Sequence, residues 1–159
     1  MAIPFIVYFS EYCIMKILII NGPNLARLGL REPEKYGSKT LNDLQNYLEE
    51  KIKVLDNTEL EFFQSNYEGS LIDKIEETSD NKITKMVINP GALTHTSIAL
   101  RDCIAGTEIE TIEVHLTNIY CREDFRQKSF TAPVSKAVIS GMGFEGYWFA
   151  IQYLISNKT

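Results

Sequence analysis

The side chains with the clearest capacity for chemistry are the two histidines of the chain, His95 and His115. Imidazole changes charge near neutral pH, so each histidine is a candidate general acid or base. Glu113 precedes His115 by two residues, and residues i and i+2 of a strand lie on the same face. Glu113 can therefore orient the ring of His115, and a neighbouring carboxylate favours the protonated form of an imidazole.

A second group of reactive side chains lies in residues 21–37, NGPNLARLGLREPEKYG. This segment is too long for a tight turn, and it carries Arg27, Arg31 and Tyr36 close together in sequence. Two arginines and a tyrosine on one loop fit either a functional loop or a solvated surface loop whose arginines only aid solubility.

The elements that hold these side chains follow from the hydrophobic pattern. The continuous apolar run at 16–21, KILIIN, is typical of a buried parallel strand. Apolar residues three and four apart at 41–55 indicate an amphipathic helix, and Thr40 with Asp43 resembles a capping pair. The pattern predicts strands within 16–21, 58–65, 83–92, 109–117 and 136–141, and helices at 40–55, 69–78, 94–106 (closed by Gly106) and 144–156.

Strands and helices alternate, which favours one parallel sheet with helices on both faces. No repeat or linker divides the chain, so we predict a single α/β domain over residues 15–159. Residues 1–14 contain no Lys or Arg and are too short to span a bilayer, so we expect a disordered or peripheral extension. The aromatic residues of 144–156 are expected to pack in the core or between subunits.

An open parallel sheet binds ligands outside the carboxyl ends of its strands. Asn24 follows the first predicted strand, Asn89 ends the third, and His115 and Thr117 end the fourth. The loop at 25–37 leaves from the same edge. The sequence therefore predicts a polar crevice at this edge of the sheet.

Three segments resemble the signature blocks of one enzyme family. They are NGPNLARLGLREPEKYG, NPGALTHTSIALRD and EVHLTNIYCREDFRQKS. In content and order they resemble the type II 3-dehydroquinate dehydratases, and the resemblance runs from Lys16 to the C-terminus. It implies a flavodoxin-like three-layer sandwich with a five-stranded parallel sheet in the order 2-1-3-4-5.

The resemblance also implies an activity, the reversible loss of water from 3-dehydroquinate to give 3-dehydroshikimate through an enolate. This hydro-lyase belongs to the shikimate pathway of aromatic amino-acid biosynthesis. The family needs no metal or organic cofactor, is cytoplasmic, and assembles as a dodecamer, a tetramer of trimers. We expect no nucleic acid as partner, because the net charge is -5 and no basic run occurs. We also expect no membrane as partner, because no stretch of the sequence is suited to cross one.

Matching the blocks position by position implies the catalytic roles. Tyr36 matches the base that takes a proton alpha to the ketone, and Arg31 matches the residue that stabilises the tyrosinate. His115 matches the acid that protonates the departing hydroxyl, with Glu113 as its partner. Asn24 matches the residue that holds a water molecule against the developing enolate.

The same matching implies a substrate-binding set, which comprises Asn89, His95, Asp102, Leu116, Thr117 and Arg126. Asp102 follows His95 by two helical turns, so the two can face the same side of a helix. Arg126 can bind the substrate carboxylate, and peptide N–H groups at 116–117 can do the same. The alternatives are a surface ion pair of Arg126 with Glu123 or Asp124 and a simple surface charge at Asp102.

Elementary electrostatics is consistent with a tyrosine base. A free phenol has a pKa of about 10, too high for efficient proton abstraction at neutral pH. A guanidinium at about 4 Å is worth about 4 kcal/mol at an effective dielectric near 20, which is about three pKa units. Desolvation opposes this effect, so Arg31 can activate Tyr36 only if the loop closes over the substrate.

Other classes of site stay open on the sequence alone. Glu113, His115 and His95 can supply three metal ligands, although no second cluster supports a metal site. A flavin- or phosphate-binding protein of the same fold would need glycine-rich or hydroxyl-rich contacts after the first strand, where this chain has amides and arginine. A non-catalytic protein that binds a small acid on this fold is the main alternative.

Overall fold

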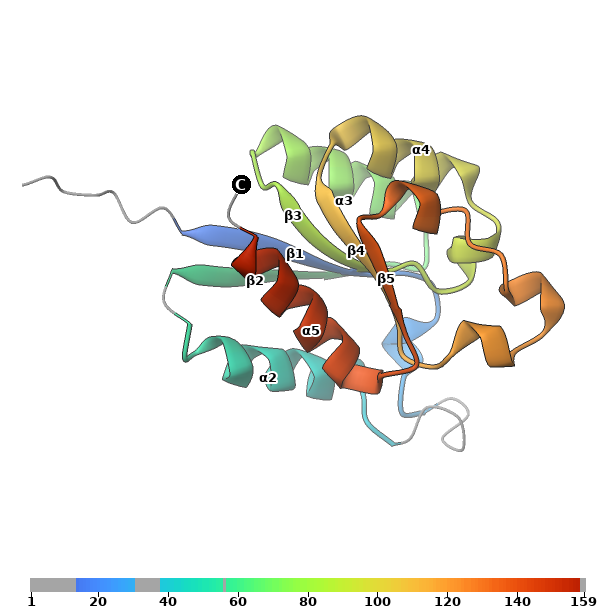
Figure 1. Cartoon of the computed structure of the whole chain (residues 1–159), viewed down its shortest axis with the longest axis horizontal. Helices are drawn as coiled ribbons and strands as arrows, with labels where there is room; N and C mark the ends of the chain where they lie inside the picture. The colour runs from blue at the N-terminus through green and yellow to red at the C-terminus, as the bar shows by residue number, and fades with distance from the viewer. Residues whose placement is uncertain (1–13, 31–37, 56, 158–159) are drawn as a thin grey trace, which may run out of the picture.

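The computed structural model of this protein describes residues 14–30, 38–55 and 57–157 (Figure 1). Within them lies a five-stranded parallel sheet in the order β2-β1-β3-β4-β5. Its strands are β1 (Met15–Asn21), β2 (Thr58–Gln64), β3 (Lys85–Asn89), β4 (Glu110–His115) and β5 (Ala137–Ser140). The predicted flavodoxin-like sandwich and its strand order are confirmed.

Helices cover both faces of the sheet (Figure 1). The helices α2 (Leu41–Ile52) and α5 (Gly143–Ser156) lie on one face, and α3 (Glu68–Asp80) and α4 (Ile98–Thr107) lie on the other. The predicted capping pair is present at the start of α2, where the Asp43 amide donates to Thr40 Oγ1 at 3.1 Å and the Thr40 amide donates to Asp43 Oδ2 at 2.8 Å. The hydrogen bond from the Thr40 backbone holds the pKa of Asp43 below its usual value.

The side chains of each strand alternate between two apolar cores. In β1, Ile17 and Ile19 pack toward α2 and α5, whereas Leu18 and Ile20 pack toward α3 and α4. Polar residues at the strand ends continue this alternation. Asn21 and Asn89 therefore lie on the α5 side of the sheet, and Glu113 and His115 lie on the α4 side.

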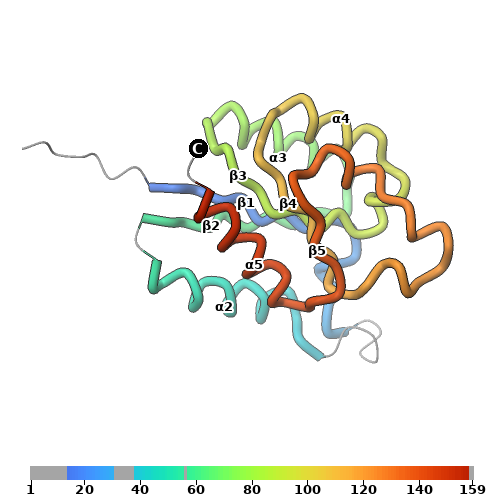
Figure 2. Tube along the Cα trace, in the orientation of Figure 1, coloured from blue at the N-terminus to red at the C-terminus, as the bar shows by residue number. Residues whose placement is uncertain are grey.

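The end of α5 lies at the amino edge of the sheet, opposite the carboxyl edge at which the parallel strands end. Figure 2 shows that α5 ends near the start of β3. The carbonyl oxygen of Asn157, which follows α5, accepts from Lys85 Nζ of β3 at 3.0 Å. Lys85 also donates to Glu110 at 2.9 Å, at the amino end of β4. The loops that follow β1, β3 and β4 consequently leave from the opposite edge.

The segment after β3 differs from the prediction of one helix at 94–106. Residues Gly91–His95 form a 3₁₀ turn, and α4 begins only at Ile98, where Ser97 Oγ caps it by accepting from the Leu100 amide at 2.8 Å. Gly106 does not close the helix, because α4 continues to Thr107 and Glu108 takes the left-handed conformation at φ 55°. His95 and Asp102 therefore do not share a helix.

Two further expectations lie partly outside the described residues. The proposed extension at 1–14 falls there except for Ile14, so its separation from a single domain at 15–159 stays a prediction. In the described parts of the chain, no helix is both long and apolar enough to cross a membrane.

The end of β1 passes close to the end of β3 at a glycine. The Gly22 amide donates to the Asn89 carbonyl at 2.8 Å, and a Cβ atom on Gly22 would lie 2.3 Å from the Pro90 carbonyl oxygen. Because this obstacle is backbone, no change of rotamer can relieve it.

The substitution Gly22→Ala should therefore destabilise the protein. We expect a loss of about 1–3 kcal/mol in the free energy of unfolding, as for other overpacked sites, measured by urea denaturation. Gly106→Ala is the matched control, because a Cβ there meets nothing within 4 Å and lies in a helix. Equal denaturation midpoints for Gly22→Ala and the wild type would contradict the close contact.

Candidate active site

A cavity of about 360 Å³ opens at the carboxyl edge of the sheet. Its walls come from the loop after β1, the end of β3 with the 3₁₀ turn that follows, and the end of β4 with its loop. Its polar lining comprises Asn24, Arg27, Asn89, His95, His115, Thr117, Arg122, Glu123 and Arg126, and Leu116 also lines it. The predicted polar crevice thus forms where the sequence placed it.

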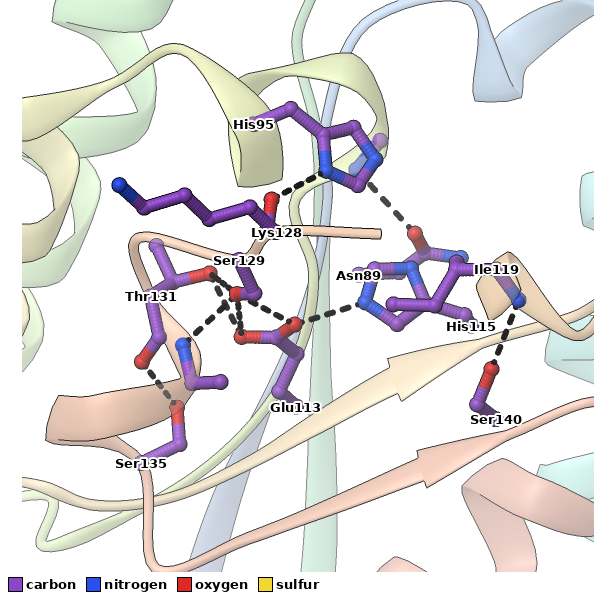
Figure 3. Close-up of polar contacts among 12 residues, drawn as sticks. Asn89, His95, Glu113, His115, Ile119, Lys128, Ser129, Thr131, Ser135 and Ser140 are labelled. Atoms are coloured by element: carbon purple, nitrogen blue, oxygen red, sulfur yellow. Dashed lines mark hydrogen bonds and ion pairs between the residues drawn. The ribbon is translucent and has the colours of Figure 1, made fainter. Parts of the chain in front are cut away.

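The predicted pair of Glu113 and His115 is formed at the end of β4. His115 Nε2 lies 2.7 Å from Glu113 Oε1 (Figure 3). The Glu113 side chain is fully buried, and it accepts further hydrogen bonds from Thr131 Oγ1 at 2.6 Å and from Ser129 Oγ at 3.1 Å. These donors matter because a buried carboxylate without hydrogen-bond partners would be strongly destabilising.

These hydrogen bonds assign the protons of the His115 ring. Ser129 Oγ accepts from the Ala132 amide at 2.8 Å, so its single proton is available for Glu113. A carboxylate in its ionised form only accepts hydrogen bonds, so with Glu113 in that form the proton of this contact is on Nε2 of His115. Nδ1 is then the ring nitrogen left for a ligand in the cavity.

Sequence reasoning missed Ser129 and Thr131. They lie 16 and 18 residues after Glu113, and no local spacing connects them to β4. A weak signal for these two residues is that both carry hydroxyls just before the turn η5 (Ala132–Val134). The amide of Ala132, the first residue of this turn, donates to Ser129 Oγ and fixes its position.

Asn89 is held by a second buried network on the other face of the sheet. Its Oδ1 accepts from the Gly91 amide at 3.2 Å, and its Nδ2 donates to the Tyr147 hydroxyl at 2.9 Å. Tyr147 donates in turn to Asn21 Oδ1 at 2.6 Å. Burial raises the pKa of Tyr147, so this hydroxyl stays neutral. The aromatic helix does pack in the core as expected, but Tyr147 also carries this polar contact.

The second histidine lies on the 3₁₀ turn and lines the cavity. His95 Nδ1 is 2.7 Å from the Lys128 carbonyl oxygen (Figure 3). A carbonyl only accepts, so Nδ1 carries a proton and Nε2 is left for a ligand. The two histidines are thus held through opposite ring nitrogens.

Asn24 lines the cavity from the loop after β1. Its backbone is left-handed at φ 70°, a conformation that asparagine tolerates better than most residues. Its amide donates to Asn66 Oδ1 at 2.9 Å, which ties this loop to the residues just after β2.

Arg126 has a position that fits a binding role, which stays a prediction, and it also forms the alternative ion pair with Glu123. It lines the cavity, and its Nε donates to Glu123 Oε2 at 3.0 Å. The pKa of Glu123 is held below its usual value, first by a hydrogen bond from the Glu123 backbone and then by the charges of Arg126 and Arg122.

Of the predicted site residues that the structure describes, Asp102 does not line this cavity. Asp102 is exposed on α4 and pairs with Arg101 at 2.7 Å, which is the position of a surface charge in the single chain. Tyr36 and Arg31 lie outside the described residues. Among the described residues, no group of three His, Cys, Asp or Glu is arranged to hold a metal ion.

A parallel α/β sheet has a cavity at its carboxyl edge, and a histidine held by a buried carboxylate lines that cavity, which is an arrangement found in α/β enzymes. More narrowly, the chain belongs to the dehydroquinase class II family, whose sequence model matches residues 15–155. The resemblance seen in the three sequence blocks is confirmed.

Individual relatives agree with this assignment. The chain is 50% identical over 141 residues to a 3-dehydroquinate dehydratase of Endomicrobium trichonymphae, covering 89% of this chain and 97% of the relative. It is 47% identical over 144 residues to a catabolic 3-dehydroquinase of Candida albicans, covering 90% and 99%. The crystal structure of a type II dehydroquinase from Butyrivibrio crossotus has a TM-score of 0.85 at 48% identity, covering 89% and 97%.

The substitution Thr131→Val should destabilise the protein by leaving Glu113 without its closest hydroxyl donor. We expect a loss of about 1.5–3 kcal/mol in the free energy of unfolding, the range for hydrogen bonds to charged groups. Thr131→Ser retains the hydroxyl and is the control. Urea denaturation in which the Val and Ser variants unfold at the same midpoint would show that this hydrogen bond is unimportant.

Proposed function

We propose that this protein is a 3-dehydroquinate dehydratase that eliminates water from 3-dehydroquinate through an enolate, giving 3-dehydroshikimate in the shikimate pathway. The observation that carries the proposal is the buried Glu113–His115 hydrogen bond at the cavity of a chain that belongs to this family. The remaining roles are assigned from the geometry of the cavity and from the matched sequence blocks.

His115 acts as the general acid in this proposal. The protonated ring donates its Nδ1 proton to the departing hydroxyl as the carbon–oxygen bond breaks, and water leaves. The ring is then neutral with its remaining proton on Nε2, where Glu113 accepts a hydrogen bond at 2.7 Å. Glu113 thus stabilises the tautomer that the reaction produces.

The proton alpha to the ketone is removed by Tyr36, with Arg31 stabilising the tyrosinate. Both roles rest on the match to the family blocks, since both residues lie outside the described part of the chain. Asn24 holds a water molecule that donates to the enolate oxygen. The backbone N–H of Asn24 donates to Asn66 Oδ1, which fixes the loop that carries this side chain.

The substrate is bound at the remaining walls of the cavity. Its carboxylate takes the peptide N–H groups at Leu116 and Thr117 and the charge of Arg126, and its hydroxyls take Asn89 and His95. Asp102 remains a proposed binding residue from the sequence match alone. No lysine lines the cavity within the described residues, so nothing in it supports an imine route to the same product.

The wider setting of the enzyme is also proposed from the family resemblance. The protein works in the cytoplasm as a homododecamer, a tetramer of trimers, without metal or organic cofactor. Its partner is the small-molecule substrate, not nucleic acid or a membrane.

The substitution Tyr36→Phe should abolish most turnover while leaving substrate binding nearly intact. Loss of a general base typically lowers kcat by about 100- to 10,000-fold, and the remaining ring still occupies the same space. Turnover is followed by the absorbance of the conjugated enone after mixing with 3-dehydroquinate, and binding is followed by calorimetry.

Tyr153→Phe is the matched control, because Tyr153 lies partly exposed on α5, away from the cavity lining. A Tyr36→Phe enzyme with most of its kcat would remove this residue from the role of base. A wild-type protein that binds the substrate without forming the enone would instead be a non-catalytic binding protein.

A further inference from the structure

We propose that Tyr147 is a positioning residue for the dehydration reaction, because its buried hydroxyl fixes the Asn89 amide with one N–H donor facing the cavity. This inference rests on the proposed function. Tyr147 itself does not line the cavity and acts only through Asn89.

The contact joins three elements at the carboxyl edge of the sheet. Asn21 and Asn89 are aligned neighbours at the ends of β1 and β3. Tyr147 reaches between them from α5, with its hydroxyl 2.6 Å from Asn21 Oδ1 and 2.9 Å from Asn89 Nδ2. All three side chains are almost completely buried, so water does not replace these partners.

The direction of each hydrogen bond follows from what its partners can do. The Gly91 amide can only donate, so the Asn89 atom facing it at 3.2 Å must be Oδ1. Nδ2 therefore faces Tyr147, whose lone pair accepts and whose single proton goes to Asn21 Oδ1. One Nδ2 proton remains, and Asn89 lines the cavity, so this proton is the donor offered to a substrate hydroxyl.

The residues around Tyr147 indicate that its hydroxyl has a role other than packing. The buried α5 residues that follow it on the same core, Ala150, Ile151 and Leu154, are apolar. The helix lies close to the sheet at Gly146, where a Cβ would be 3.3 Å from both Ile139 and Val114 side chains. A phenylalanine would fill the same space without the hydroxyl. The polar group is therefore not required for packing, and its partners are the two strand-end amides.

We expect the substitution Tyr147→Phe to change KM much more than kcat. With phenylalanine at position 147 the Asn89 amide loses one of its two anchors, and KM should rise by about tenfold, the equivalent of one hydrogen bond. The kcat value should change much less, because His115 and Glu113 lie on the other face of the sheet and have a separate network.

The test is steady-state kinetics of the full chain with 3-dehydroquinate, comparing Tyr147→Phe with two controls on α5. Tyr153→Phe removes a partly exposed hydroxyl, and Ile151→Val removes a buried methylene from the same core. Both controls should keep the wild-type KM. In addition, Tyr147→Phe should raise KM no further in an Asn89→Ala background, since residues that act through one another are non-additive.

Each outcome decides between the possibilities. A wild-type KM for a folded Tyr147→Phe enzyme, or an additive increase in the double variant, would overturn the positioning role and leave Tyr147 a structural residue. If Tyr147→Phe does not fold, Asn21→Leu is the second variant. It removes the acceptor that fixes the direction of the Tyr147 hydroxyl, so the hydroxyl should hold Asn89 less firmly and KM should also rise. An unchanged KM for Asn21→Leu would overturn the inference. A folded wild-type protein without dehydratase activity would overturn the proposed function, and the inference with it.

Discussion

The hydrogen bond between Glu113 and His115 is the interaction on which the candidate site depends. A fully buried carboxylate is stable only when donors surround it, and here the donors are the His115 ring, Ser129 and Thr131. Since the two hydroxyls come from the segment before β5, the loop after β4 must fold back over its own strand. The same folding brings Arg126, which lies on that loop, to the wall of the cavity.

Because side chains alternate between the two faces of the sheet, the site residues are supported by different elements on each face. Glu113 and His115 are supported on the α4 side, whereas Asn89 is supported on the α5 side through Tyr147. The cavity opens where these faces meet, at the carboxyl edge. The proposed acid and the proposed binding amide therefore have separate supporting networks, so we expect a defect in one network to leave the geometry of the other largely unchanged.

Local patterns explain how much the sequence could predict. Apolar runs and the i, i+2 relation are sufficient to place Glu113 and His115 together, and the three family blocks supply the strand order. Ser129, Thr131 and the Tyr147 contact depend on distant segments meeting in space, which no spacing encodes. The apolar pattern predicts a helix from position 94, but residues Gly91–His95 form a 3₁₀ turn. That pattern does not reveal that Ser97 caps a separate helix. The roles of Tyr36 and Arg31 remain predictions.

In the proposed reaction, His115 is held through Nε2 and offers Nδ1 to the substrate. The chain has only two histidines, and the structure holds His95 through the other nitrogen, Nδ1. Nitrogen-15 NMR of histidine-labelled protein, recorded above the pH range in which imidazole normally titrates, distinguishes the two tautomers directly. We expect an Nε2–H tautomer for His115 and an Nδ1–H tautomer for His95, with the two signals assigned by means of a His95→Gln variant. An Nδ1–H tautomer for His115 would contradict this expectation.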